Sequence, residues 1–323
     1  MALSALQLEV RDGLLDDGQK TLPPHLLYDE VGSALFEAIT KLGEYGLTDA
    51  EERNLQKCAP QLARMCRPEV TVIELGSGSG RKTRLILESL AERGPVEYDA
   101  IDVSEEALKQ CGREMEDIAN VTFRGVQGTY MEGLKQALSE RPQGRQVLLL
   151  FLGSTLGNLE LDEAQDFLCS LRDMLDPGDL FFLGADMVKD EDALLTAYDD
   201  PAGVTAAFNL NLLSRLNREL DADFQLHRFQ HQVRYDRDLQ RVEMHLRSLR
   251  DQTVEIKGLD VRFDLRRGET IHTESSHKFR EEDLHQMAER AGFGILRCWV
   301  DQRWAFSDCL WTAGPPLRNE ETP

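Results

Sequence analysis

The segment between residues 69 and 186 constrains the fold most, because short apolar runs alternate in it with amphipathic stretches of helical length. The apolar runs lie at 70–75, 98–103, 121–126, 147–152 and 180–183, and the helical stretches lie at about 82–93, from 104, at 131–138 and at 162–175. A strand followed by a helix returns the chain in the same direction, so this alternation predicts a parallel sheet with helices on both faces. We therefore expect a doubly wound α/β core.

The rest of the chain follows other patterns. After two expected helices between 187 and 220, apolar and polar residues alternate through 222–278, as at Val242, Met244 and Leu246, which predicts an antiparallel sheet. A helix is expected at 281–291 and closing strands at 294–300 and 309–313. Residues 1–68 are expected to be helical, with Thr48 as the N-cap of a second helix and Glu51 completing a capping box. The chain thus divides into segments 1–68, 69–193, 194–280 and 281–323.

The charge balance narrows the possible partners. The 323 residues carry 37 Lys and Arg against 58 Asp and Glu, a net charge of −21. Such a surface repels phosphate backbones, so a nucleic-acid partner is not expected, whereas a small zwitterion needs only local complementarity. The apolar runs are of strand length, so no membrane span is expected. Glu9, Arg11 and Asp12 interrupt the N-terminus, which is typical of a cytoplasmic protein without a signal peptide.

The cysteines and histidines indicate no metal centre. The six cysteines are scattered without any CxxC spacing, which argues against structural zinc and iron–sulfur clusters and favours reduced thiols; they are Cys58, Cys66, Cys111, Cys169, Cys298 and Cys309. His227 and His231 have a spacing that suits a metal pair on a helix, but they lie where a strand is expected to begin, and no third ligand is evident.

A glycine-rich loop lies where the first strand meets the first helix, with the sequence Glu74-Leu75-Gly76-Ser77-Gly78-Ser79-Gly80. Glycines at alternate positions allow a tight turn and a close approach to a flat ligand. The spacing is GxGxG, whereas dinucleotide-binding loops usually read GxGxxG. Lys82 could meet the carboxylate of S-adenosylmethionine, and Asp102 at the end of the second strand could accept its ribose hydroxyls. These residues favour an adenosyl cofactor, with a dinucleotide or a ligand-free turn as alternatives.

Several longer segments resemble a known family. Beyond the glycine loop, the matching stretches are 22–24 with 27–29, 32–33, 35–36, 39–40, 44–45, FLGSTLGNL at 151–159, YDD at 198–200, GVTAAFN at 203–209, and 273–279. Over about residues 20–313 the chain resembles the histidine-specific methyltransferases of the ergothioneine pathway, a family that also includes fungal indole-alkaloid N-methyltransferases.

The resemblance implies a Rossmann-like class I methyltransferase core at 69–193, which binds S-adenosyl-L-methionine and releases S-adenosylhomocysteine. It implies an inserted α+β antiparallel substrate-binding domain at 194–280, with 1–68 contributing to the substrate pocket. The implied reaction is three methylations of the α-amino group of L-histidine to hercynine, the first step of ergothioneine biosynthesis. We expect a monomer.

The resemblance also implies roles for individual residues. Asn158, Tyr28 and Tyr198 are the implied catalytic residues. Of these, Asn158 and Tyr198 hold the carboxylate and amino end of the substrate, and Tyr28 lines the pocket beside them. The implied substrate pocket further contains Tyr45, Thr155, Met244, Glu274 and Ser276, with the last two on the imidazole ring. The implied cofactor contacts are Glu74, Gly76, Ser77, Gly78, Lys82, Asp102, Thr129 and Tyr130. The chain departs from the family pattern at Gly128-Thr129-Tyr130, where Gly-Asp-Phe is usual, which affects an adenine contact. It also departs at Gly43 and Gly46, which loosen the loop around Tyr45.

The predicted ring pocket favours histidine as the substrate. A carboxylate accepts a hydrogen bond from an imidazole N–H, and a serine can donate to or accept from the other ring nitrogen. If 272–278 is a strand, Glu274 and Ser276 point to the same side. His272 and His277 flank Glu274, and we expect both to face away from it. An enzyme that methylates tryptophan or another aromatic amino acid stays an alternative, and a cofactor-binding protein without catalysis is a more remote one.

Overall fold

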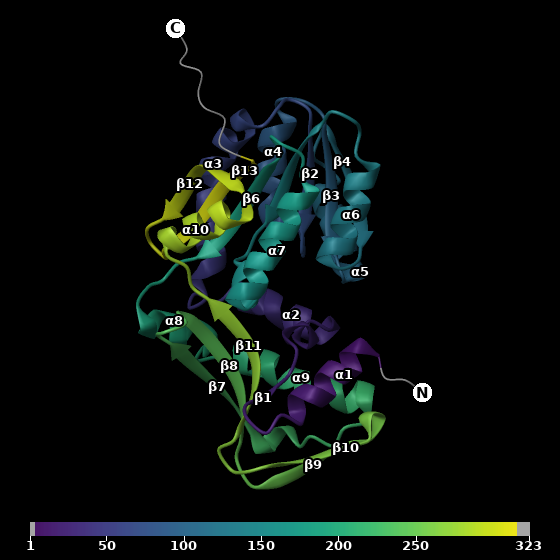
Figure 1. The fold of residues 1–323 in the computed structure, drawn as a ribbon, viewed down its shortest axis with the longest axis vertical. Helices are drawn as coiled ribbons and strands as arrows, with labels where there is room; N and C mark the ends of the chain where they lie inside the picture. Colours follow the sequence, from purple (N-terminus) through teal and green to yellow (C-terminus); the bar gives the residue numbers. More distant parts are fainter. Residues whose placement is uncertain (1–3, 315–323) are drawn as a thin grey trace. The chain divides into compact units, whose positions relative to one another are not determined.

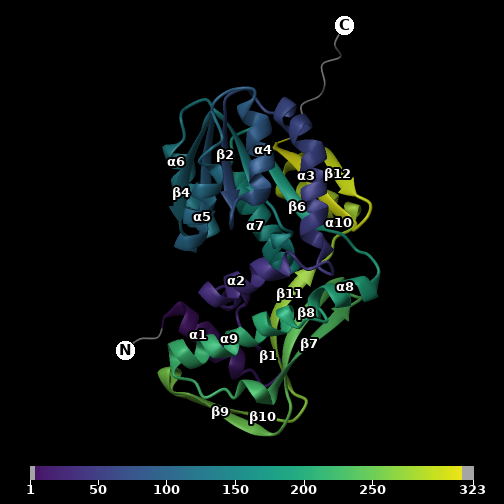
Figure 2. The same cartoon turned by 180° about the vertical axis from the view of Figure 1, so that it is seen from behind.

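The computed structural model describes residues 4–314, and it divides the chain into two compact units. We call Asp49–Val188 together with Phe279–Pro323 the α/β unit, and Met1–Thr48 together with Lys189–Lys278 the antiparallel unit. The helices and strands are labelled in Figure 1 and, from behind, in Figure 2. The four functional segments expected from the sequence stay a prediction, but the N-terminal 48 residues group with the antiparallel sheet.

The α/β unit contains a seven-stranded sheet in the order β12-β13-β6-β5-β2-β3-β4. The parallel strands are β2 (Val70–Leu75), β3 (Val96–Asp102), β4 (Val121–Gln127), β5 (Gln146–Phe151) and β6 (Leu180–Asp186). The hairpin of β12 (Phe293–Asp301) and β13 (Phe306–Ala313) joins β6 in antiparallel direction. This arrangement confirms the predicted doubly wound sheet and its two closing strands.

Helices cover both faces of this sheet (Figure 1 and Figure 2). On one face, α6 (Tyr130–Glu140), α7 (Leu161–Met174) and α10 (Glu281–Ala291) pack on alternate strand residues such as Leu149 and Phe181. On the other face, α3 (Gly46–Met65), α4 (Arg81–Ala91) and α5 (Glu105–Met115) pack on the intervening residues such as Leu148 and Phe182. Strands β2, β5 and β6 are buried along their whole length, which explains why their sequences are mostly apolar.

The antiparallel unit is built around a four-stranded sheet in the order β1-β11-β8-β7. Its strands are β7 (Phe229–Asp236), β8 (Arg241–Ser248) and β11 (Thr270–His277), with β1 (Lys20–Thr21) added in parallel to β11, and β9 (Gln252–Ile256) pairs separately with β10 (Val261–Leu265). The helices are α1 (Ala5–Leu14), α2 (Glu30–Ile39), α8 (Glu191–Tyr198) and α9 (Val204–Leu220), and the short 3₁₀ turns are η1 (Pro24–Leu27), η3 (Leu226–Arg228) and η4 (Lys257–Leu259). Helix α9 packs on β7 and β8 and against α2.

Two local predictions are wrong. Helix α3 begins at Gly46, so Thr48 lies inside it and forms no capping box with Glu51, whose carboxylate has other partners. Cys298 and Cys309 form a disulfide rather than two isolated thiols, because they face each other across the β12–β13 hairpin. The cysteines at 58, 66, 111 and 169 are free thiols.

The described part of the chain contains neither a candidate membrane span nor a candidate metal site. Within residues 4–314 no helix combines the length and apolar character needed to cross a bilayer. In the same range no group of three or more His, Cys, Asp or Glu side chains is arranged to hold a metal ion.

Candidate active site

The glycine loop lies between β2 and α4 and has the tight geometry that its sequence predicts. Gly76, Gly78 and Gly80 have φ angles of 72°, 52° and 75°, which L side chains rarely adopt. The Gly76 N–H donates to the Ile101 carbonyl at 2.8 Å. A Cβ on Gly76 would lie 3.2 Å from the Tyr130 hydroxyl, so the loop backbone runs close to the start of α6. The loop is thus tied to the end of β3 by a hydrogen bond that its own backbone donates.

Asp102 ends β3 beside this loop. Its Oδ2 accepts from the Gly78 N–H at 3.0 Å and its Oδ1 accepts from the Ser104 N–H at 2.9 Å. Each carboxylate oxygen can accept a second hydrogen bond, so both remain able to bind ribose hydroxyls. Thr129 and Tyr130 lie at the start of α6. Burial and the nearby Asp102 charge raise the pKa of Tyr130 to about 12, so its phenol stays protonated.

Glu74 lies within β2, behind the loop. Its carboxylate is fully buried and accepts hydrogen bonds from the hydroxyls of Thr83 and Tyr98. Burial raises the pKa of Glu74 to about 7, although these two hydroxyls and Lys82 counteract the rise. The hydrogen bond from Thr83 therefore links Glu74 to the first turn of α4, and Glu74 stabilises the loop between β2 and α4.

Lys82, in the first turn of α4, forms an ion pair with Glu51 of α3. The other Glu51 oxygen accepts from the Gly153 N–H at 2.7 Å. Burial lowers the pKa of Lys82, but the Glu51 carboxylate outweighs this effect and holds it above its usual value. Nearby Asp308 is buried and accepts from the Asn54 amide at 2.9 Å, and burial with the Glu51 charge raises its pKa well above normal. Sequence analysis missed Glu51, because it was assigned to a helix cap.

The FLGSTLGN segment turns sharply after β5. Gly153 and Ser154 both have positive φ angles, 76° and 60°, and the Ser154 hydroxyl accepts from the buried Asp186 N–H at 2.9 Å. A 3₁₀ turn, η2 (Thr155–Asn158), follows, and the Thr155 hydroxyl donates to the Leu152 carbonyl at 2.9 Å. Asn158 ends this turn half-buried, and within residues 4–314 no side chain or backbone group hydrogen-bonds its amide. That amide is therefore available to a ligand.

The predicted ring-binding residues lie in the antiparallel unit, on one face of its sheet. Glu274 and Ser276 alternate along β11 and pair with Met244 and Val242 of β8. Both are buried, and Oε1 of Glu274 has no hydrogen-bond partner among the described residues. Burial raises the pKa of Glu274 to about 7, while Lys278 and a hydrogen bond from Tyr28 act in the opposite direction. A buried acceptor without a donor among the described residues can accept a hydrogen bond from a ligand.

Lys278 joins this group, and sequence analysis gave it no role. Its buried ammonium donates to the Ser276 hydroxyl at 2.8 Å and to the Tyr198 hydroxyl at 2.9 Å. The Tyr198 hydroxyl in turn donates to Ser276 at 2.8 Å, and the ammonium lies 4.9 Å from the centre of the Tyr198 ring. The signal was present, because residue 278 continues the two-residue alternation of Glu274 and Ser276.

The three predicted pocket tyrosines are also in this unit and belong to an aromatic cluster. The Tyr45 and Tyr198 rings meet edge to face at 6.0 Å, and Tyr28 contacts Phe36 and Phe208, each at 5.5 Å. Asp29, the residue after Tyr28, is the N-cap of α2. Its carboxylate also accepts hydrogen bonds from Asn211 and Arg218 of α9, which attach this segment to α9.

His231 anchors the backbone of Tyr198. Its Nε2 lies 2.8 Å from the Tyr198 carbonyl, and its Nδ1 lies 2.9 Å from the Asn209 amide nitrogen. Because the amide can only donate there, Nδ1 accepts and Nε2 carries the hydrogen. Burial lowers the pKa of His231, so the ring stays neutral at pH 7.

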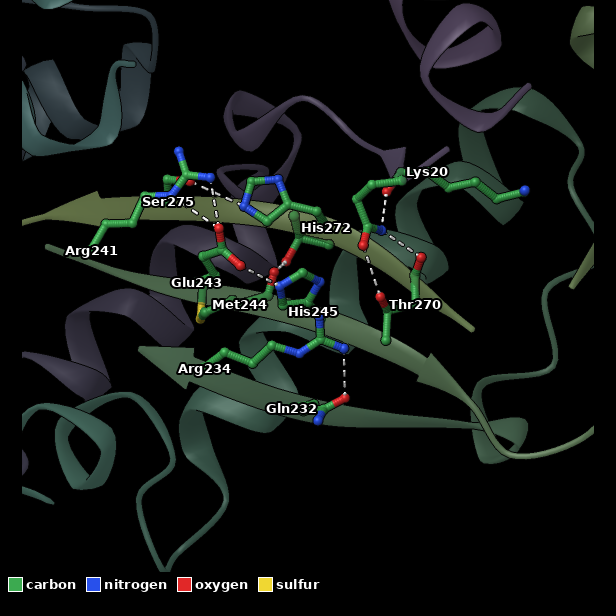
Figure 3. Close-up of polar contacts among 12 residues, drawn as sticks. Lys20, Gln232, Arg234, Arg241, Glu243, Met244, His245, Thr270, His272 and Ser275 are labelled. Atoms are coloured by element: carbon green, nitrogen blue, oxygen red, sulfur yellow. Dashed lines mark hydrogen bonds and ion pairs between the residues drawn. The ribbon is translucent and has the colours of Figure 1, made fainter. Parts of the chain in front are cut away.

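The opposite face of the same sheet carries a separate polar cluster (Figure 3). His245 lies 3.0 Å from Glu243, and Ser275 lies 3.1 Å from His272. Burial lowers the pKa of His245 to about 4, so it is neutral at pH 7. The register confirms that His272 and His277 face away from Glu274, since they pair with His245 and Arg241. This cluster is therefore distinct from the ring-facing side chains.

Each unit thus contains one part of the predicted site. The predicted cofactor residues lie in the α/β unit, and so do Thr155 and Asn158. The antiparallel unit contains the residues predicted to bind the ring and the methylated amine, which are Tyr28, Tyr45, Tyr198, Met244, Glu274 and Ser276.

Comparison with known proteins identifies the family. The model of the S-adenosylmethionine-dependent histidine-specific methyltransferases matches residues 6–313. The chain is 40% identical over 304 residues to histidine N-alpha-methyltransferase of Mycobacterium tuberculosis, covering 94% of this chain and 93% of that one. It is 38% identical over 202 residues to ergothioneine biosynthesis protein 1 of Neurospora crassa, covering 62% of this chain and 23% of that one. It is 29% identical to an L-tryptophan methyltransferase of Psilocybe serbica, covering 92% and 90%.

These matches confirm the predicted methyltransferase activity and the S-adenosylmethionine cofactor. The chain belongs to the family of S-adenosylmethionine-dependent histidine-specific methyltransferases.

Proposed function

We propose that this enzyme methylates the α-amino group of L-histidine three times to give hercynine, the first step of ergothioneine biosynthesis. The observation that carries the substrate choice is the buried pair of Glu274 and Ser276 on one face of β11, with a Glu274 oxygen that has no partner in the described chain. The names of the relatives from M. tuberculosis and N. crassa support the same reaction and pathway.

This pair suits imidazole better than indole. Imidazole offers one N–H and one bare nitrogen, which can engage a carboxylate and a hydroxyl together. Indole has a single N–H and no ring acceptor, so one of the two buried groups would stay unpaired. A site built to bond polar ring atoms rejects an analogue that lacks them, because desolvated groups are then left without partners. Tryptophan stays the second candidate substrate, since a relative is named for it.

The α/β unit fits an adenosyl cofactor. The three left-handed glycines bring no side chain into the loop at their own positions, and both Asp102 oxygens keep accepting capacity for ribose hydroxyls. Lys82 would hold the methionine carboxylate, with Ser77, Thr129 and Tyr130 around the adenosine, while Glu74 supports the loop. When bound, the cofactor supplies a methyl group on a positively charged sulfur, which a neutral amine can attack in line.

The substrate amine is oriented by Asn158 and the tyrosines. The Asn158 amide has no partner among the described residues and can accept from the α-amino group, directing its lone pair. An α-amino group has a pKa of about 8, so the site must bind its deprotonated form. Tyr28, Tyr45 and Tyr198 offer ring faces that stabilise the growing methylammonium by about 0.5–2 kcal/mol each when water is excluded. These rings favour repeated methylation, and Thr155 and Met244 are further residues that we propose for substrate binding.

We further propose that the enzyme acts as a cytoplasmic monomer without nucleic-acid partners. The net charge of −21 supports the last point, because it opposes binding to phosphate backbones. Size-exclusion chromatography with light scattering measures the oligomeric state, and a dimer would contradict the proposal.

Mass spectrometry tests the reaction. Purified enzyme is given S-adenosylmethionine with either histidine or tryptophan, and we expect mono-, di- and trimethylated histidine and little methylated tryptophan. Ser276→Ala should lower kcat/KM for histidine by about tenfold or more, because a buried ring nitrogen loses its partner.

Ser275→Ala is the matched control for this experiment. Ser275 is the next residue on β11 and faces the opposite side, so its substitution should leave kcat/KM within about twofold. Methylation of tryptophan but not histidine, or an equal loss in the two variants, would show that the ring pocket has been misassigned.

A further inference from the structure

Lys278 sets the direction of the hydrogen bonds around Ser276. An ammonium group has donors and no acceptor, so its contacts to Ser276 at 2.8 Å and to Tyr198 at 2.9 Å deliver hydrogens to those oxygens. The Tyr198 hydroxyl donates its own hydrogen to Ser276 at 2.8 Å. Ser276 Oγ therefore receives two hydrogen bonds.

Two received hydrogen bonds use both lone pairs of the Ser276 oxygen. The hydrogen-bonding capacity left to this residue is its own O–H, which can donate to a ligand. The reverse arrangement, in which Ser276 donates to Tyr198, is less favourable because a phenol is the stronger acid and a serine oxygen the better acceptor. Burial of both residues keeps water from reorienting the hydroxyl.

Glu274 supplies the complementary group. It lies two residues earlier on the same strand and faces the same side, and its Oε1 lacks a donor in the described chain. A carboxylate oxygen accepts, whereas the Ser276 hydroxyl donates. The ring-facing side of β11 thus presents one acceptor and one donor at fixed positions.

We infer that Lys278 is a specificity-determining positioning residue that makes Ser276 a hydrogen-bond donor, so that the pocket takes an uncharged imidazole in a single tautomer. This inference rests on the proposed histidine substrate. A neutral imidazole places its N–H on Glu274 and its bare nitrogen on Ser276. An imidazolium has a second N–H, which would meet the Ser276 hydrogen and lie near the Lys278 charge.

The test compares histidine with 1,2,4-triazolylalanine, whose ring stays uncharged in the same pH range. The ratio of kcat/KM for the two substrates cancels the titration of Glu274 and largely that of the α-amino group, which both share. With a ring pKa of about 6.5, the neutral fraction of histidine rises about tenfold from about pH 5.5 to about pH 8. In the wild-type enzyme we expect the ratio of histidine to triazole to rise by the same factor.

Lys278→Met should flatten this rise to about threefold or less, because the freed Ser276 oxygen can then accept from an imidazolium. Lys278→Arg, which keeps charged donors, should retain the full rise. If Lys278→Met does not fold, Lys278→Gln replaces it, and we expect an intermediate slope because its amide can also accept from Ser276.

Three outcomes are distinguishable. A wild-type enzyme that does not methylate histidine overturns the proposed function itself. A wild-type ratio independent of pH overturns the inference while leaving the reaction intact. A full tenfold rise in a folded Lys278→Met or Lys278→Gln variant also overturns it, because Ser276 would then be a donor without Lys278.

Discussion

At the scale of single residues, Glu274 combines burial with incomplete hydrogen bonding. Desolvation favours the neutral form of its carboxyl group, and the opposing effects of Lys278 and Tyr28 do not cancel it, so its pKa is raised from 4.5 to about 7. The folded enzyme therefore binds a proton that the unfolded chain releases between these pH values. Near pH 7 the Glu274 carboxyl group is close to its pKa, so the binding of a polar ring can change its charge.

This raised pKa predicts a pH dependence of stability. Because the folded state favours the protonated form of Glu274, the contribution of Glu274 to stability is fully present below about pH 4.5 and is lost as the pH rises through about 7. Relative to Glu274→Gln, the wild-type free energy of unfolding should fall across this interval by an amount on the order of 3 kcal/mol. Urea unfolding followed by circular dichroism at a series of pH values measures the difference, and parallel curves would contradict the prediction.

The sequence was informative about residues that follow a repeating pattern. Glu274 and Ser276 were predicted on one face from strand alternation, and the glycines of the loop from their spacing. Glu51 was not predicted, because its partners Lys82 and Gly153 lie 31 and 102 positions away in the sequence. Contacts of this kind depend on tertiary packing, which a local pattern does not encode.

At the scale of secondary-structure elements, alternation predicted the strands of the α/β unit well. Strands β2, β5 and β6 are buried on both faces, so their sequences are almost continuously apolar and stand out from the helices. The start of α3 and the pairing of Cys298 with Cys309 were missed. The first prediction rested on a capping box with Glu51, whose carboxylate bonds other elements, and the second depends on the register of a hairpin.

Glu51 connects three elements, α3, α4 and the turn after β5, and its removal should destabilise the α/β unit. Glu51→Gln leaves the Lys82 ammonium without its buried counter-charge, so we expect a loss of about 3 kcal/mol in the free energy of unfolding. The neighbouring Glu52 forms a more exposed ion pair with Arg81, so Glu52→Gln should cost less than about 1 kcal/mol. Urea titrations of both variants check this, and equal losses would contradict it.

At the scale of the whole molecule, the sequence predicted two kinds of sheet but not how the N-terminal segment is used. Residues 1–48 belong with 189–278, because β1 pairs with β11 and α2 packs against α9. Strand β1 has only two residues, too few to show a pattern. Asp29, which joins the Tyr28 segment to α9, is likewise separated from its partners by more than 180 positions.

The tryptophans report on one unit alone. The chain has three, Trp299, Trp304 and Trp311, and all lie in the α/β unit. S-adenosylhomocysteine at about 100 times its dissociation constant should stabilise this unit by about 2.7 kcal/mol, which raises the urea midpoint measured by tryptophan fluorescence. Asp102→Ala should abolish the shift. An unchanged midpoint in the wild-type enzyme with bound cofactor would place the cofactor elsewhere.

The order of the strands also determines when the molecule can fold as it leaves the ribosome. The sheet of the α/β unit places β13, made from residues 306–313, directly beside β6, and the other sheet needs β11 to pair with a strand at residue 20. Neither sheet can be completed until most of the chain has been synthesised. Until β13 emerges, the edge of β6 stays open to pairing with other chains, so the nascent protein depends on protection from aggregation at that edge.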